Sequence, residues 1–165
     1  DIDLLICTHF DLDHAGNHAA FPRAEFVVQR EHLDLARSGH PRYTEVRDQW
    51  DHPTVRSRYR TVEGDTELLP GVTLIETSGH APGHQSVLVR LPQTGPVLLT
   101  IDAVPQQRVF SPDRPAWPAD DNEEQVRAST RKLLDLVARE QVPLTVFGHD
   151  GAQWQSLTKT PGYYA

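Results

Sequence analysis

Four short segments of this 165-residue chain place metal-binding side chains directly beside apolar stretches. The first segment follows Leu4–Cys7, and the others lie at residues 77–86, 98–102 and 145–150. Apolar runs of this length predict buried strands, and polar side chains at strand ends are well placed for chemistry. The chain is therefore expected to build one site from four separate parts of its sequence.

The composition limits the classes of protein to consider. An apolar content of 38% and a charged content of 24% are typical of a soluble globular protein. No apolar run approaches the roughly 18 residues that cross a bilayer, and a net charge of -7 argues against a general nucleic-acid binder. The single cysteine, Cys7, excludes an internal disulfide and a four-cysteine zinc site. We expect Cys7 to be a buried small hydrophobe and, by default, the chain to be cytoplasmic.

The pattern of strands and helices predicts a mixed α/β fold with helices packed on sheets. Strands are expected at residues 4–7, 25–29, 66–69, 72–76, 86–91, 97–101 and 143–147, and helices at residues 31–37 and 122–140. Asn122 can cap the second helix, which we expect to serve packing only. Its expected apolar stripe comprises Val126, Thr130, Leu133, Leu134 and Val137.

The polar segment 38–60 is expected to be an inserted loop or a helical excursion. Its aromatic residues Tyr43, Trp50 and Tyr59 leave two alternatives open. They could line the mouth of a substrate pocket and contact an acyl chain, or they could simply fill the core, as aromatic residues usually do.

The densest motif is the loop after the first expected strand. Histidine and carboxylate side chains bind metals, and a loop is needed to make neighbouring side chains converge. Alone, the motif could instead be a polar loop whose Asp13 caps a helix, and the other three segments could be ordinary turns or strand ends. Together they favour a metal site, whose candidate residues are His9, Asp11, Asp13, His14, His84, Asp102 and His149.

These motifs resemble those of the metallo-β-lactamase superfamily. Within it, residues 79–86 (GHAPGHQS), 97–103 (VLLTIDA) and 147–150 (FGHD) are most similar to N-acyl homoserine lactonases, as are residues 62–65 and 69–72. The resemblance implies a four-layer αβ/βα sandwich with a two-metal site between its sheets. Residues 1–165 would then form a single domain, comprising the C-terminal two thirds to three quarters of the family fold without its N-terminal strands.

The resemblance also implies roles for individual residues. His9 and His84 would bind a first metal ion, while Asp13, His14 and His149 would bind a second. Asp102 would bridge the two ions, and His80 would have no ligand role. The implied cofactor is a pair of divalent ions, zinc first, with manganese or iron as alternatives. Hydroxide held by these ions would open a lactone ring, and Asp13 or Asp102 would carry the proton to the leaving oxygen.

Two positions depart from the family pattern. Asp11 stands where the family has a histidine, and Pro105 stands where the lactonases have a tyrosine. A carboxylate can still bind zinc, whereas proline cannot donate a hydrogen bond to a substrate. The alternatives are therefore another hydrolase of the superfamily, acting on a different lactone, thioester, β-lactam or phosphoester, or a metal-binding fragment without turnover. A dimer is one possible assembly.

Overall fold

Two β-sheets form the centre of the computed structural model, which describes residues 2–165. The first sheet contains three parallel strands in the order β1 (Leu4–Ile6), β2 (Glu25–Gln29) and β3 (Tyr59–Val62). The second contains five strands in chain order, namely β4 (Thr66–Leu69), β5 (Val72–Glu76), β6 (Gln85–Leu91), β7 (Gly95–Ile101) and β8 (Leu144–Phe147). Neighbouring strands of the second sheet are antiparallel, except that β8 runs parallel to β7. All seven predicted strands are present, and β3 is an additional one.

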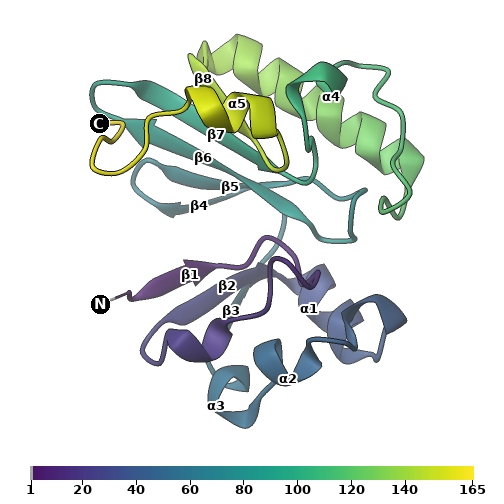
Figure 1. Cartoon of the computed structure of the whole chain (residues 1–165). Coiled ribbons are helices and arrows are strands. Elements are labelled where there is room, and N and C mark those ends of the chain that lie inside the picture. The colour runs from purple at the N-terminus through teal and green to yellow at the C-terminus, as the bar shows by residue number, and fades with distance from the viewer. Residues whose placement is uncertain (1) are drawn as a thin grey trace.

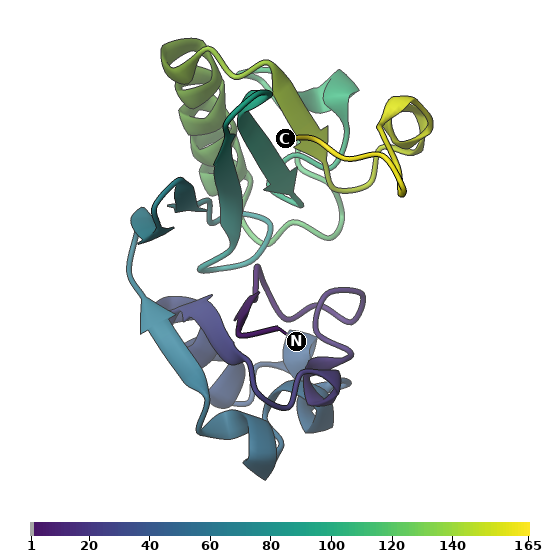
Figure 2. The same ribbon diagram turned by 90° about the vertical axis from the view of Figure 1, so that its left-hand side faces the viewer.

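Helices cover the outer faces of both sheets (Figures 1 and 2). On the first sheet lie α1 (Arg30–Arg37), α2 (Arg47–Trp50) and α3 (Pro53–Arg56), so the segment 38–60 is largely a helical excursion. On the outer face of the second sheet lies α4 (Glu123–Glu140), whereas the short helix α5 (Gly151–Ser156), which follows β8, lies on the opposite side of this sheet (Figure 2). The remaining elements are the 3₁₀ turns η1 (His18–Ala20), η2 (Pro41–Tyr43) and η3 (Gln107–Val109). The predicted cap of α4 is confirmed, because the Asn122 side chain accepts a hydrogen bond from the Gln125 N–H at 3.0 Å.

Three separate apolar clusters show that the molecule has four layers. Successive side chains of a strand point to opposite faces of its sheet, so Phe26 and Val28 pack against the helices of the first sheet, whereas Val27 packs between the sheets. In the same way Leu74 lies between the sheets, and Ile75 faces α4. The order helix, sheet, sheet, helix is the predicted αβ/βα sandwich.

Helix α4 packs along a slightly different stripe from the one predicted. Val126, Thr130 and Leu133 are buried as expected, but Leu136 is also buried and Leu134 is only half-buried. Among the helices of residues 2–165, none combines the length and apolar character needed to span a membrane.

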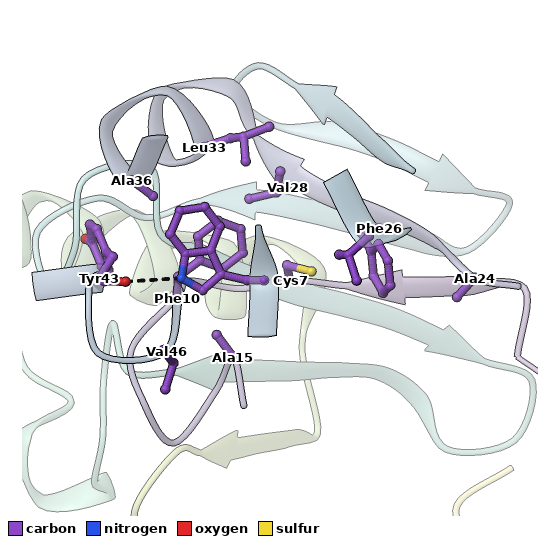
Figure 3. Close-up of a cluster of buried hydrophobic side chains, with 12 residues drawn as sticks. Cys7, Phe10, Ala15, Ala24, Phe26, Val28, Leu33, Ala36, Tyr43 and Val46 are labelled. Carbon is purple, nitrogen blue, oxygen red and sulfur yellow. Dashed lines mark hydrogen bonds between the residues drawn. The ribbon is translucent and has the colours of Figure 1, made fainter. Parts of the chain in front are cut away.

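The aromatic residues of the segment 38–60 belong to the core under the first sheet, and Figure 3 shows Tyr43 in this cluster. Tyr43 and Trp50 are completely buried, and the Trp50 indole N–H donates to the Tyr43 carbonyl at 3.2 Å. The Trp50 ring stacks on Phe10 at a centroid distance of 4.8 Å. Tyr59 packs on the same cluster and donates its hydroxyl to the Trp50 carbonyl at 2.6 Å. Of the two alternatives for these rings, core filling therefore describes Tyr43 and Trp50, and Tyr59 packs on the same cluster.

Candidate metal centre

The loop after β1 presents the first four candidate ligands. Its turn is closed by hydrogen bonds from the His14 and Ala15 N–H groups to the Asp11 carbonyl, at 2.9 and 3.0 Å. Buried His32 of α1 fixes the loop from behind, because its Nε2 accepts from the Phe10 N–H at 2.8 Å and its Nδ1 donates to the Pro82 carbonyl at 2.6 Å. His32 thereby ties the loop after β1 to the segment 77–86.

The second segment reaches the site through His80. Gly79 has a φ of +134°, and a Cβ there would lie only 2.3 Å from the backbone nitrogen of Val126 in α4. The Gly79 carbonyl accepts hydrogen bonds from the N–H groups of Asp121 and Asn122, both at 2.9 Å. Glycine lets the loop press against the start of α4, and this contact directs His80 into the site. Helix α4 therefore positions a site residue, so the prediction that it only packs is too narrow.

Asp102 and His149 come from the ends of the parallel strands β7 and β8. Gly148 separates them, since a Cβ there would lie 2.5 Å from the Ile101 carbonyl oxygen and 2.7 Å from Asp102 Oδ1. Without a side chain at this position the two strand ends approach closely, and His149 Nε2 lies 3.2 Å from Asp102 Oδ1. The His149 N–H also donates to the Pro105 carbonyl at 2.8 Å.

Two groups of candidate ligands result, and we call them the inner and the outer group. In the inner group, His9, Asp11 and His80 place their ligand atoms within 4.8 Å of one another, with His80 Nε2 at 3.2 Å from Asp11 Oδ2. In the outer group, Asp13, His14 and His149 do the same, with Asp13 Oδ2 at 3.4 Å from His14 Nε2 and 3.6 Å from His149 Nε2. The inner group is largely buried, and the outer group is open to solvent.

Asp102 lies where the two groups meet. Its Oδ2 is 3.4 Å from His80 Nε2 and 3.6 Å from His14 Nε2, and it forms a third compact set with His9 and His14. Burial alone would raise the pKa of Asp102, but interactions with His14, His9 and His80 hold that pKa well below its usual range. Asp102 is therefore a carboxylate at neutral pH, as a bridging ligand must be.

Neighbouring charges also set the state of the histidines. Burial lowers the pKa of His9, which keeps its imidazole neutral. For His80 the effect of burial is overcome by the carboxylates of Asp11 and Asp120, which raise its pKa to about 9. Asp120 accepts from His80 Nδ1 at 3.0 Å and is itself paired with fully buried Arg114 at 3.1 Å. A carboxylate on the far side of an imidazole is the usual support of a metal-binding histidine.

His84 does not join either group. It is completely buried, its Nδ1 bonds to the Thr77 hydroxyl at 2.8 Å, and its ring centroid lies 5.1 Å from that of His9. Its buried Nε2 has no hydrogen-bond partner within residues 2–165, whereas His80 Nε2 lies 3.1 Å from Arg42 Nη2 and 3.2 Å from Asp11 Oδ2. Both histidines follow a glycine, and the sequence-based choice of His84 as the ligand stays a prediction.

The donor set fits a divalent metal ion. The Nε2 atoms of His9, His14 and His84 are buried and form no hydrogen bond within residues 2–165, although buried polar atoms nearly always have a partner. Imidazole nitrogen and carboxylate oxygen are ligands that zinc, manganese and iron accept. The remaining candidates, Asp13, Asp102 and His149, point into the same region.

A cavity of about 250 Å³ adjoins these ligands. Ligands from both groups line it, as do Pro105 and Trp117, neither of which was predicted to contact a substrate. A larger cavity of about 550 Å³ lies between β7, β8 and α5, is mostly apolar, and touches the candidate ligands only at His149. Chemistry is more readily placed in the smaller cavity, because only there do charged side chains converge.

The sequence profile described as the Metallo-beta-lactamase superfamily matches residues 1–149. The chain belongs to this superfamily. Among curated relatives, an N-acyl homoserine lactonase of Bacillus sp. is 36% identical over 163 residues, which cover 99% of this chain and 62% of the relative. The lactonase AttM of Azorhizobium caulinodans is 35% identical over 179 aligned positions, covering 99% and 64% of the two chains.

The solved structures place this superfamily member close to the same enzymes. An N-acyl homoserine lactone hydrolase, determined with the product N-hexanoyl-L-homoserine at its catalytic metal centre, superimposes with a TM-score of 0.85 at 36% identity. The match covers 96% of this chain and 60% of that structure. This chain thus spans about three fifths of the length of its lactonase relatives.

Proposed function

We propose that this superfamily member hydrolyses the ring ester of an N-acyl homoserine lactone with the help of a divalent metal ion. One observation carries the proposal: histidine and aspartate side chains from four separate motifs converge beside a cavity of about 250 Å³. The similarity to lactonases along almost the whole chain supports the substrate class.

The outer group, His9, His84 and Asp102 would hold the pair of divalent ions predicted from the sequence. When bound, a divalent ion supplies a Lewis acid that polarises a carbonyl oxygen and makes a water nucleophilic near neutral pH. Zinc is the first choice for these donors, with manganese and iron as alternatives because Asp13 and Asp102 are hard oxygen ligands.

Asp13 is the better of the two predicted proton carriers. The low pKa of Asp102 makes this carboxylate a poor proton acceptor, and its place among the histidines suits a ligand. The Asp13 side chain is 60% exposed at the cavity, so its carboxylate can reach the attacking water and the ring oxygen. It would take the proton from the water and return it to the leaving alkoxide, as general acid–base catalysis requires.

Two further residues would shape substrate binding. Trp117 offers an aromatic wall to the acyl chain, while its backbone N–H donates to Asp120 Oδ2 at 2.7 Å and keeps this wall next to His80. Pro105 lines the same cavity without an N–H, and its carbonyl holds the backbone of His149. The hydrogen bond that a tyrosine would give to the substrate at this position is therefore missing from the proposed pocket.

The test is the conversion of N-hexanoyl homoserine lactone to its ring-opened acid by the metal-loaded protein, followed by mass spectrometry. Activity should be lost in Asp102→Asn and after removal of the metal with a chelator, and zinc should restore it to the unmodified protein. Asp34→Asn, a change on the exposed side of α1, is the control and should remain active. Metal binding without lactone opening would refute the proposal. A parallel panel of a thioester, a β-lactam and a phosphoester would then identify another hydrolase activity.

Cytoplasmic location and dimer formation stay predictions.

A further inference from the structure

A fully buried arginine lies behind one wall of the smaller cavity. Arg114 belongs to the loop 111–121, which runs between η3 and the start of α4 and carries Trp117. Its Nη2 lies 3.1 Å from Oδ2 of Asp120, whose side chain is also buried. We propose that Arg114 is a positioning residue for the substrate, because it acts through Asp120 to hold Trp117 against the cavity. The inference rests on the proposed function, in which Trp117 faces the acyl chain.

The backbone of the loop 111–121 is held mainly at its ends. Three of its residues are prolines, which have no N–H to donate. Near its start, the Arg114 N–H donates to the Ser111 carbonyl at 3.1 Å, and the Arg114 carbonyl accepts from Arg127 Nε of α4 at 3.3 Å. The middle of the loop, which includes Trp117, is held by Asp120.

Asp120 binds Trp117 and His80 with different oxygens. Its N–H donates to the Trp117 carbonyl at 2.9 Å, and its Oδ2 accepts from the Trp117 N–H at 2.7 Å. Its Oδ1 accepts from His80 Nδ1 at 3.0 Å. Arg114 Nη2 lies nearer to Oδ2, at 3.1 Å, than to Oδ1, at 3.4 Å. The guanidinium therefore supports chiefly the oxygen that binds Trp117.

The unpaired nitrogens of Arg114 argue against a role in stability alone. Its Nε and Nη1 are buried and have no hydrogen-bond partner within residues 2–165. A buried donor without a partner costs free energy, and well-packed apolar residues often replace a buried ion pair without loss of stability. An apolar side chain would therefore serve packing better than this arginine. The charge of Arg114 instead fixes the orientation of the Asp120 carboxylate, and with it the position of Trp117.

The first test is the hydrolysis of N-hexanoyl homoserine lactone by the metal-loaded protein. In Arg114→Met, KM should rise about three- to tenfold, which corresponds to the loss of one hydrogen bond. The kcat should change little, because His80 keeps its contact with the other oxygen of Asp120. Arg114→Lys retains the positive charge and should restore most of the affinity. Asp113→Asn, at the exposed neighbouring residue, is the matched control and should keep the unmodified KM.

A double variant separates positioning from a general loss of stability. An arginine that acts through Trp117 no longer affects binding once this ring is absent, so Arg114→Met should not raise KM further in a Trp117→Ala background. A general loss of stability would act in both backgrounds.

The second test is independent of lactone hydrolysis and uses tryptophan fluorescence of the metal-free protein. Trp154→Phe removes an exposed tryptophan, and Trp50 is completely buried, so quenching by acrylamide then reports on half-buried Trp117. In this background Arg114→Met should raise the quenching constant and shift the emission maximum to longer wavelength. Asp113→Asn should do neither.

An unchanged KM or an unchanged quenching constant in Arg114→Met that is folded by circular dichroism would overturn the inference. An equal rise of KM with and without Trp117 would also overturn it. Arg114→Gln, a milder change with the same expected effects, replaces Arg114→Met if that variant does not fold. The proposed function fails separately: no lactone hydrolysis by the unmodified protein refutes the lactonase, whereas the quenching result still decides whether Arg114 holds Trp117.

Discussion

Replacing Gly79 by alanine should damage the fold at the point where the His80 loop meets α4. The new Cβ would lie 2.3 Å from Val126 N, 2.7 Å from Val126 Cα and 2.8 Å from Gln125 C. All three atoms belong to the backbone of the first helical turn, so no side chain can rotate away to relieve the overlap. The start of the helix would have to move.

The structure gives the size of the effect. An L-residue held at the φ of +134° found for Gly79 costs about 1–3 kcal/mol in backbone strain. Moving the helix start away from the loop breaks the two hydrogen bonds accepted by the Gly79 carbonyl, each with a net value of about 0.5–1.5 kcal/mol. The free energy of unfolding should therefore fall by about 2–6 kcal/mol.

Urea unfolding followed by circular dichroism measures this loss. Gly39→Ala is the matched control, because Gly39 has a φ of +90° but a Cβ added there would meet no atom within 4 Å. The Gly39→Ala substitution should lower the free energy of unfolding only by the backbone strain, about 1–3 kcal/mol. Equal destabilisation by the two substitutions would refute the argument that close contact with α4 requires glycine at position 79.

Four further substitutions test other parts of the site and of the core. Asp120→Asn should lower the free energy of unfolding by about 3–5 kcal/mol, because it leaves the fully buried Arg114 guanidinium without its carboxylate; urea unfolding measures this. In the metal-free protein, the raised pKa of His80 should contribute stability that is complete below pH 6.5 and lost as the pH rises through about 9. Urea titrations across this range should show that loss in the unmodified protein and a smaller one in His80→Gln; equal slopes would contradict it. Trp50→Ala should destabilise by about 3–5 kcal/mol with an unchanged KM, whereas Trp117→Ala should raise KM with little change in stability. The opposite pattern would place Trp50 in the pocket.

The sequence predicts the layered fold well because each layer depends on local patterns. The alternation in residues 25–29 and 72–76 specifies which side chains face a helix and which face the other sheet. Short elements are harder to predict. Helix α5 has six residues, begins at a glycine and buries none of its side chains, so it leaves no periodic signal.

The site was only partly predictable for a different physical reason. Strand ends locate the loop after β1, Asp102 and His149, but the position of His80 depends on a contact of Gly79 with a helix more than 40 positions later. Arg42 gave no signal at all, since a single arginine in a polar segment resembles any exposed charge. Its ion pair with Asp11 becomes visible only when the fold brings the two residues together.

The candidate ligands are divided between the two halves of the sandwich, and this has a mechanical consequence. His9 and His14 follow a strand of the first sheet, whereas Asp102 and His149 follow strands of the second. An ion held by residues from both sheets would cross-link the two halves of the sandwich. A ligand that binds only the folded state stabilises it by about 2.7 kcal/mol at a hundred times its dissociation constant. Removal of the ion by a chelator should therefore weaken the packing of one sheet on the other before either half of the sandwich unfolds.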